Sequence, residues 1–262
     1  MDTAALLAWY ERVRRPLPWR ATRDPYALLV SEVMLQQTQA ARVVPYYEAF
    51  VARFPGAVAL AAAPVGEVLA AWSGLGYNRR ALALRAAAGA VAAEGWPADL
   101  TELPGVGPYT AAAVASFAWD EQVAAVDTNV RRVIARWDGV ARTPAALAER
   151  ARALLPAARA AAFNQAMMEL GATVCRPRRP ACEACPVRAG CASAGRVRAA
   201  PVPRTRERFE DTDRWARGRI VAALVAGEPP PRLERARRER AEAGLLRDGL
   251  VLRAADGALR LP

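Results

Sequence analysis

Two carboxylates, Glu32 and Asp127, lie in surroundings that suit acid–base chemistry. Glu32 falls within an expected helix that begins at Pro25, and it sits one turn from both Leu28 and Leu35. An ionised carboxylate between leucines is costly, so we expect a raised pKa and a proton donor in a dry pocket. The alternative is a glutamate at the edge of the apolar face whose carboxylate reaches water, because Glu is rarely fully buried.

Asp127 directly precedes another helical pattern. Asp is a preferred N-cap, so one interpretation of this position is purely structural. The other is catalytic, because glycoside cleavage pairs a proton-donating carboxyl group with a second carboxylate beside an oxocarbenium-like transition state. Asn129 is placed to orient Asp127, whereas Arg131 and Arg132 fit phosphate contacts or solvated charges.

The composition narrows the chemistry further. The 262 residues include no His, and every basic side chain is Arg because the sequence contains no Lys. These absences exclude a histidine base, histidine metal ligands, a lysine Schiff base and a Walker-type phosphate lysine. Proton transfer therefore falls to Asp, Glu, Tyr or Cys. The net charge of +11, from 37 basic and 26 acidic residues, favours a polyanionic partner such as nucleic acid.

The stretch from Leu103 to Thr110 has the features of a phosphate-binding hairpin. Gly105 and Gly107 flank Val106, so the backbone can adopt positive φ and several N–H groups can face one anion. Pro108 then starts a helix whose positive dipole end points the same way. Such a site binds phosphate without regard to base sequence, and the alternative is an ordinary tight turn between helices.

All four cysteines fall within 17 residues, with the spacing C-x6-C-x2-C-x5-C: Cys175, Cys182, Cys185 and Cys191. Four thiolates so close together suggest either structural zinc or a four-iron cluster. Zinc sites made of four cysteines more often use two C-x2-C pairs, and only one pair occurs here, so the spacing favours iron–sulfur. Disulfides are disfavoured, because we expect a cytosolic protein.

The elements that must position these groups are helices. From 24 to 136 the pattern is helical, with breakers such as Pro45, and a second helical stretch covers 144–173. Residues 192–213 are rich in Arg and Pro and are expected to form a linker. Two helices and a hairpin with an Asp-Gly turn then suggest a winged-helix-like module over 214–262. No apolar run approaches the roughly 18 residues of a membrane span, and no secretory signal is evident at the start.

Four segments together resemble a known superfamily. Residues 31–39 (SEVMLQQTQ), the 103–110 hairpin, residues 126–130 (VDTNV) and the cysteine spacing resemble the helix–hairpin–helix, Gly/Pro–Asp DNA glycosylases, and within them the MutY-type adenine DNA glycosylases. The match runs from about Leu6 to Cys191. It implies a mainly α, two-lobed catalytic region with a [4Fe–4S] cluster. It also implies that the partner is double-stranded DNA with adenine mispaired with 8-oxoguanine or guanine, and that water is the only cosubstrate.

The resemblance also assigns roles by position. Glu32 would protonate the flipped adenine, and Asp127 would stabilise the sugar cation or bond to it transiently, while Tyr109 and Asn129 would line that site. Adenine leaves poorly as an anion, so a carboxylic acid that is neutral at pH 7 has a clear purpose. The expected contacts with base and duplex are Arg20 at the adenine, Gln37 and Tyr77 where the base has left, and Gly105, Val106, Gly107 and Arg131 along the backbone.

Tyr109 distinguishes two branches of the superfamily. The bifunctional endonuclease III type carries a lysine nucleophile at this position, whereas this chain has Tyr and no lysine anywhere. We therefore expect a monofunctional glycosylase. The rival interpretations are a glycosylase of the same fold that acts on thymine or uracil in G mispairs, and a non-catalytic iron–sulfur DNA-binding protein.

The expected domain order ends in a departure from the longer family members. These carry a Nudix-like C-terminal domain that contacts 8-oxoguanine, but only about 70 residues follow Cys191 here, so selectivity for the opposite base stays open. We expect a monomer in the bacterial cytoplasm, associated with the nucleoid. The expected segments are 1–24 packing with the iron–sulfur lobe, 25–126 as a six-helix lobe, 127–195 as the iron–sulfur lobe, 196–213 as a basic linker and 214–262 as the winged-helix-like module.

Overall fold

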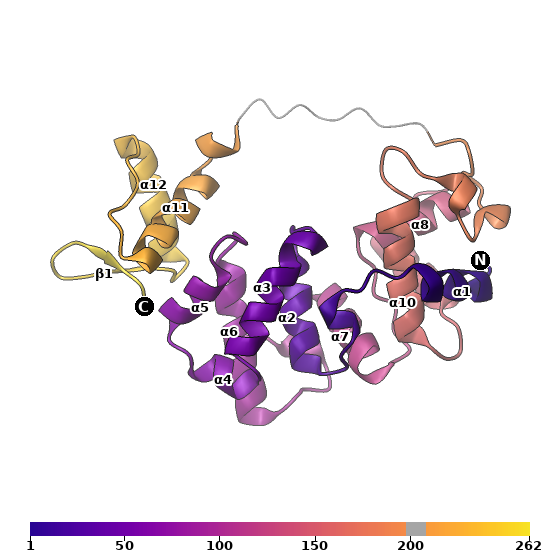
Figure 1. The fold of residues 1–262 in the computed structure, drawn as a ribbon, viewed down its shortest axis with the longest axis horizontal. Helices are drawn as coiled ribbons and strands as arrows, with labels where there is room; N and C mark the ends of the chain where they lie inside the picture. Colours follow the sequence, from indigo (N-terminus) through magenta and orange to yellow (C-terminus); the bar gives the residue numbers. More distant parts are fainter. Residues whose placement is uncertain (198–207) are drawn as a thin grey trace. The chain divides into compact units, whose positions relative to one another are not determined.

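The computed structural model describes residues 1–197 and 208–262 (Figure 1). Within them the chain is mainly helical, with twelve α-helices and a single two-stranded sheet, which confirms the expected fold class. The described residues form two compact units, 1–32 with 106–197 and 33–105 with 208–262. None of the helices in the described ranges is both long and apolar enough to span a bilayer.

The first unit holds most of the residues of interest. Its helices are α1 (Thr3–Val13), the first part of α2 (Pro25–Leu35), α7 (Pro108–Trp119), α8 (Thr128–Asp138), α9 (Pro144–Leu154) and α10 (Ala160–Glu169). A π-helical turn, Leu170–Val174, continues α10 towards the cysteines. Short 3₁₀ turns lie at Pro18–Arg20, Cys182–Ala184 and Arg188–Gly190.

Two apolar clusters hold this unit together. In the larger one, α1 packs against α10, α8 and α9 through Leu6, Ile134 and Met167, among others. In the smaller one, Leu28 of α2 meets Phe117 of α7, and α10 closes the cluster. The smaller cluster fixes the start of α2 and the whole of α7 in this unit. The unit boundaries therefore fall after residues 32 and 105, whereas the sequence suggested a lobe over 25–126.

The second unit contains the remaining helices and the hairpin. They are α3 (Ala40–Arg53), α4 (Ala57–Ala62), α5 (Val65–Trp72), α6 (Arg79–Glu94), α11 (Asp213–Ala226) and α12 (Arg235–Arg247), with 3₁₀ turns at Leu100–Glu102 and Phe209–Asp211. Strands β1 (Leu252–Arg253) and β2 (Leu259–Arg260) pair antiparallel, with Leu252 opposite Arg260. We refer to residues 208–262 as the C-terminal module.

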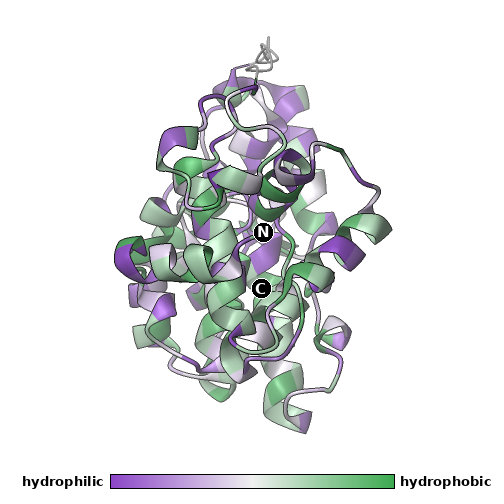
Figure 2. Cartoon of the chain, turned by 90° about the vertical axis from the view of Figure 1, so that its right-hand side faces the viewer, coloured by the Kyte–Doolittle hydropathy of each residue, from purple (hydrophilic) through white to green (hydrophobic). Residues whose placement is uncertain are grey.

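Aromatic side chains form part of the core of the second unit. The ring of Phe50 lies 4.9 Å from that of Phe54 and 6.0 Å from that of Trp72, both in edge-on geometry. Helix α6 packs on α4 and α5, and α11 of the C-terminal module packs on α5. Figure 2 shows hydrophobic and hydrophilic residues alternating along single helices, as amphipathic helices require. The helix–helix–hairpin order fits the expected outline of the module, and residues 198–207 of the expected linker lie outside the described residues.

Candidate active site and cysteine site

Glu32 is buried in the first unit. Asp24 caps α2 by accepting the N–H groups of Tyr26 at 3.1 Å and Ala27 at 3.2 Å, so the helix begins where the sequence predicts. The Glu32 residue is only 4% exposed, which rules out a carboxylate that reaches water at the edge of the helix. Its Oε2 atom accepts a hydrogen bond of 2.8 Å from the hydroxyl of Tyr109, in the first turn of α7.

The surroundings of Glu32 keep it partly protonated at neutral pH. Burial raises the pKa of Glu32 to about 7, although the hydrogen bond from Tyr109 opposes the shift, and the negative charge of Asp127 adds to it. The pKa of Tyr109 lies well above 10, first because of burial and then because of the charges of Glu32 and Asp127. Tyr109 is therefore a neutral hydrogen-bond donor, and the three groups share one electrostatic environment.

Asp127 is held rigidly at the start of α8. Its Oδ1 atom accepts the N–H of Val130 at 2.7 Å, as an N-cap does, and its Oδ2 atom accepts the side-chain amide of Asn129 at 2.7 Å. The capping interpretation is thus correct as structure. It does not exclude chemistry, because a carboxylate fixed on both oxygens is preorganised to face a developing positive charge.

Arg132 connects Asn129 with the segment that precedes the cysteines. Its guanidinium donates to Asn129 Oδ1 at 2.7 Å, to the carbonyl of Gly171 at 2.7 Å and to the carbonyl of Cys175 at 2.8 Å. A Cβ atom on Gly171 would lie 2.5 Å from Asn129 Cβ, so only glycine permits this close approach. The expectation that Arg132 is a phosphate contact or solvated charge is wrong, because its donors are used inside the protein, whereas Arg131 is exposed on α8.

Glu169 is a buried carboxylate that no sequence motif indicated. Its side chain has no exposed surface and accepts hydrogen bonds from Arg15 at 2.7 and 2.8 Å and from Arg20 at 2.7 Å. Burial alone would raise the pKa of Glu169, but the two arginines outweigh it and the pKa is lowered. Arg20 also lies over the ring of Tyr10, at 5.5 Å from its centre. The structure therefore gives Arg20 a protein carboxylate as partner, and its contact with adenine stays a prediction.

In the second unit, Gln37 and Tyr77 occupy two loops joined by one arginine. Both residues have positive φ, 59° for Gln37 and 50° for Tyr77, which is uncommon outside glycine and concentrates at functional sites. Arg80 donates to the carbonyls of Val33 at 2.7 Å, Met34 at 3.1 Å and Gln36 at the end of α2. It also donates to the carbonyl of Gly76 at 3.1 Å, next to Tyr77. Arg80 thus fixes both loops to each other.

The expected hairpin has the required local geometry. Gly105 has φ of +76°, and a Cβ atom there would lie 2.6 Å from Ala83 Cβ, so glycine is needed for both conformation and space. Val106 is buried, and Gly107 is the N-cap of α7 with Pro108 in its first turn. Gly107 and Pro108 are exposed at the N-terminal end of α7, so this end of the helix dipole faces solvent, and its contact with a phosphate stays a prediction.

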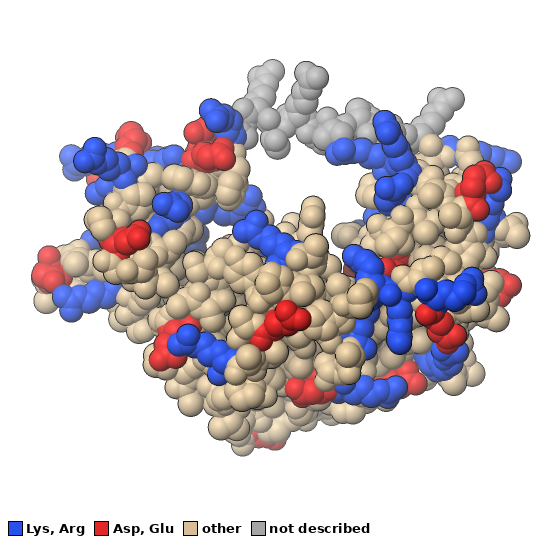
Figure 3. Space-filling view, viewed as in Figure 1, with Lys and Arg blue, Asp and Glu red and all other residues tan. Residues whose placement is uncertain are grey.

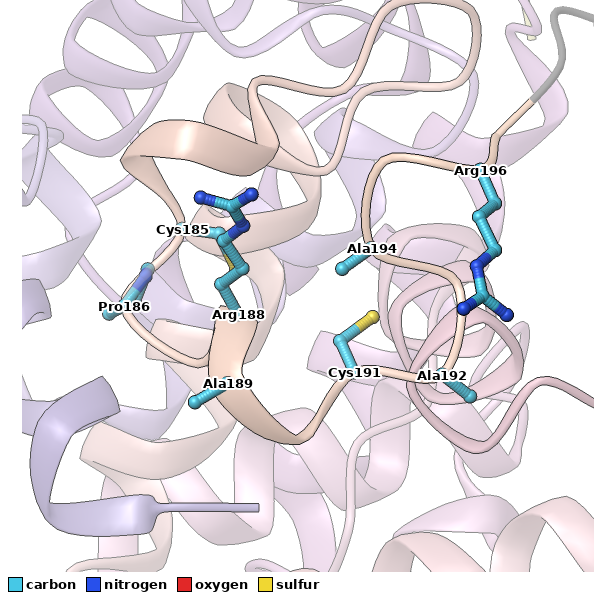
Figure 4. Close-up of a pocket in the computed structure, with 8 residues that line it drawn as sticks. All are labelled: Cys185, Pro186, Arg188, Ala189, Cys191, Ala192, Ala194 and Arg196. Atoms are coloured by element: carbon cyan, nitrogen blue, oxygen red, sulfur yellow. The ribbon is translucent and has the colours of Figure 1, made fainter.

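None of the four cysteines forms a disulfide, and all four line one small cavity. The same cavity includes Arg136 and Arg188, and Arg136 donates to the sulfur of Cys175 at 3.4 Å. Figure 4 shows Cys185, Cys191, Arg188 and Arg196 around an adjoining hollow. Burial raises the pKa of Cys185, and the neighbouring cysteines raise it further. Within the described residues, no three His, Cys, Asp or Glu side chains stand close enough together to hold a metal ion.

Comparison with known proteins places the chain in a family. Residues 30–157 match the model of the HhH-GPD superfamily of base excision DNA repair proteins. The adenine DNA glycosylase of Mycobacterium tuberculosis is 45% identical over 281 residues, which cover 98% of this chain and 92% of that protein. The chain belongs to the adenine DNA glycosylase family. The resemblance expected from the motifs is thereby confirmed.

Solved structures support the same fold. A thermostable thymine-DNA glycosylase superposes with a TM-score of 0.68 and 33% identity, covering 72% of this adenine DNA glycosylase family member and 93% of that chain. A trapped endonuclease III–DNA covalent intermediate gives a TM-score of 0.64 at 22% identity, covers 73% and 93% of the two chains, and supports the fold alone. The likeness to the thymine enzyme is weaker and shorter than that to the adenine family, so it does not favour the thymine alternative.

Proposed function

We propose that this chain removes adenine from DNA by hydrolysing its N-glycosidic bond in base excision repair, with Glu32 as the acid and Asp127 as the stabilising carboxylate. The observation that carries this assignment is the buried Glu32, with a pKa of about 7 and a hydrogen bond to neutral Tyr109. A carboxylic acid of this pKa is matched to proton transfer at neutral pH. Asp127 lies close enough to influence it electrostatically while staying a separate, fixed group.

The proposed reaction divides the work between the two carboxylates. Once adenine is flipped out of the duplex, protonated Glu32 donates its proton to a ring nitrogen, so the base leaves as a neutral molecule. As the C1′–N bond breaks, positive charge grows on the sugar, and ionised Asp127 stabilises it or bonds to it transiently. Water then adds to C1′, and the proton that it releases restores the acid. Asn129 keeps the Asp127 carboxylate in place through its amide hydrogen bond.

The same residues make strand cleavage unfavourable. A β-lyase step needs an amine that forms a Schiff base with the opened sugar. Tyr109 stands at the position from which the related bifunctional enzymes supply lysine, and its raised pKa keeps it a neutral phenol. Since the chain has no lysine, we propose that the reaction ends at the abasic site.

Single-turnover reactions on four duplexes test which base is removed. The duplexes hold A opposite 8-oxoguanine, A opposite G, T opposite G and U opposite G. The adenine duplexes are expected to react, and the thymine and uracil duplexes to stay intact. Strand breaks should appear only after alkali, because the abasic product persists. Faster release of thymine or uracil than of adenine would contradict the assignment, and breaks without alkali would contradict the monofunctional mechanism.

We further propose that Cys175, Cys182, Cys185 and Cys191 hold a [4Fe–4S] cluster. The donor set fits, because iron–sulfur clusters are bound by four thiolates, and all four cysteines line one cavity. Arg136 and Arg188 at the same cavity offset the negative charge of the thiolates. A cluster held by these four cysteines would cross-link loops that have little secondary structure of their own. Arg132 donates hydrogen bonds to both the carbonyl of Cys175 and the side chain of Asn129, and Asn129 in turn holds Asp127.

Replacing Cys185 by Ser is expected to lower bound iron and thermal stability together, because one cluster ligand is lost from a loop that depends on it. Metal analysis and the visible absorption of the purified protein measure the first effect, and a melting curve measures the second. Wild type should hold about four iron atoms per chain. Ser193→Ala, which alters the same cavity without touching a ligand, serves as control. One zinc per chain in wild type would overturn the iron assignment.

A further inference from the structure

Aromatic rings and guanidinium groups alternate in a column in the second unit. The guanidinium of Arg80 lies 5.3 Å from the ring centre of Trp72 and 5.4 Å from that of Tyr77. The guanidinium of Arg214 lies 5.0 Å from Tyr77 and 4.8 Å from Phe209. We call Tyr77, Arg214 and Phe209 the outer stack. It joins a loop of the glycosylase region to the C-terminal module, and Arg214 also donates a hydrogen bond to the Tyr77 hydroxyl.

The column runs from the core to solvent. Trp72 is fully buried at one end, whereas Tyr77 is 41% exposed and Phe209 is 50% exposed. Single exposed apolar residues are common, but two exposed rings beside one guanidinium form a patch that suits a ligand. The outer stack therefore offers two ring surfaces and one guanidinium to a ligand.

The guanidinium of the outer stack has no carboxylate within ion-pair distance among the described residues. Among the ion pairs of the described residues, none includes Arg214 or Arg80. Many other arginines of the chain do pair, and Figure 3 shows red groups beside blue ones over much of the visible face. Arg214 therefore lies between two exposed rings, whereas the guanidinium of Arg80 is used on backbone carbonyls. Stacking surfaces with cationic neighbours are what nucleic-acid-binding proteins present to bases and phosphates.

The C-terminal module holds the outer stack in a fixed position. Thr212 caps α11, accepting the N–H of Trp215 at 3.2 Å, so Arg214 is anchored in the first turn. Arg237 of α12 donates to the carbonyl of Thr212 at 2.8 Å. Asp248, which follows α12, pairs with both Arg217 of α11 and Arg79 of α6. These contacts orient Phe209 and Arg214 relative to Tyr77 before any ligand arrives.

We propose that the C-terminal module supplies a DNA contact at the lesion, in which the Phe209 ring stacks on a base of the duplex beside Tyr77 and Arg214 contacts a phosphate. The inference rests on the proposed glycosylase function and on the expectation, from the family resemblance, that Tyr77 occupies the duplex where the base has left. Arg214 lies between the two rings, so the Tyr77 and Phe209 rings are separated by a single side chain. DNA that contacts Tyr77 therefore comes close to Phe209. The module is thereby a part of the substrate-binding surface and a source of its affinity.

Equilibrium binding to a duplex with a tetrahydrofuran abasic analogue opposite 8-oxoguanine tests the proposal without cleavage. Phe209→Ala is expected to raise Kd at least about fivefold, the low end of the loss for one base–aromatic stack. Phe209→Trp should bind as wild type, because it keeps a stacking ring. Arg214→Ala should weaken binding. It should also make the plot of log Kd against log salt concentration less steep, by the amount expected for about one phosphate contact. Leu252→Ala is the matched control, since Leu252 is a 55% exposed apolar residue of the same module.

Wild-type Kd for Phe209→Ala, with an unchanged melting curve, would overturn the proposal. So would a loss with Arg214→Ala alone, because that would make Arg214 a support for Tyr77 rather than a DNA contact. Equal losses for Leu252→Ala and Phe209→Ala would also overturn it. Cleavage of the A·8-oxoguanine duplex by the wild-type preparation is measured in parallel. Failure of that reaction rejects the proposed function, whereas normal cleavage with unaltered Phe209→Ala binding rejects only the further inference.

Discussion

Replacing Glu32 by Gln is expected to slow adenine release at pH 7 by about 10²- to 10⁴-fold, the range over which general acid catalysis contributes. Gln fills the same space and can accept the Tyr109 hydrogen bond at its carbonyl oxygen, so the pocket is preserved. What it lacks is a proton that can be given to the leaving base. Single-turnover rates on a duplex holding A opposite 8-oxoguanine, with alkali to reveal abasic sites, measure the change.

The pH dependence of the wild-type enzyme follows from the same group. Because the pKa of Glu32 is about 7, the competent protonated form dominates below that value, and the rate should fall as pH rises through 7. The free energy of unfolding should also fall as pH rises. A carboxyl group whose pKa rises from 4.5 to about 7 on folding favours the native state fully below pH 4.5, and that contribution is lost as pH rises through 7. Glu32→Gln, which is neutral throughout, should lose less stability over this interval.

Glu67→Gln is the matched control, because Glu67 is half-exposed and pairs with Arg53 at the surface. It should leave both the rate and its pH dependence unchanged. A Glu32→Gln variant that cleaves within about tenfold of wild type would contradict the acid assignment, as would a wild-type rate that does not change between pH 6 and 8.

Local sequence patterns predicted the central parts of this site because they depend on short-range geometry. The burial of Glu32 follows from leucines one turn away on either side, and helical periodicity alone puts them on one face. The cap at Asp127 follows from an Asp before a helical pattern. The four cysteines meet because only 17 residues contain them all. Each of these inferences concerns residues that are close together in the sequence, so the local backbone conformation is enough to bring them together.

Contacts between segments far apart in the sequence could not be predicted from local patterns. Arg20 and Glu169 are 149 positions apart, and no pattern in either segment identifies the other as its partner. The sequence placed Arg132 at the surface beside Arg131, because two of its acceptors are backbone carbonyls, which no side-chain pattern can indicate. Such acceptors exist only once α8 and the π turn pack together.

Packing also overrode a local signal within α3. Pro45 marks an expected break, yet the helix runs through it from Ala40 to Arg53. The cost is one missing backbone hydrogen bond near the start of the helix. The buried side chains of Val43, Tyr47 and Phe50 offset it, because they follow helical spacing on both sides of the proline. The sequence contains both a helix breaker and helical spacing of apolar residues. Tertiary packing of those apolar residues decides that the helix continues.

Replacing Asp127 by Asn is expected to separate capping from catalysis. Asn and Asp are nearly equal as N-caps, so the bond to the N–H of Val130 can be kept and the melting temperature should change little. The negative charge is lost, however, and with it the stabilisation of the sugar cation. Removal of one preorganised electrostatic group typically lowers a rate by about 10²- to 10³-fold, and we expect at least that loss here.

Asp2→Asn makes the same substitution at another N-cap and serves as the control. Asp2 caps α1 by accepting the N–H of Ala5 at 2.9 Å, so its variant should match wild type in both rate and melting temperature. A marked fall in the melting temperature of Asp127→Asn that accompanied the fall in rate would mean that the lost cap explains both effects. The catalytic role of Asp127 would then be contradicted. A double variant with Glu32→Gln adds a second criterion. Because both carboxylates act on one bond-breaking step, their combined loss should be smaller than the product of the single losses.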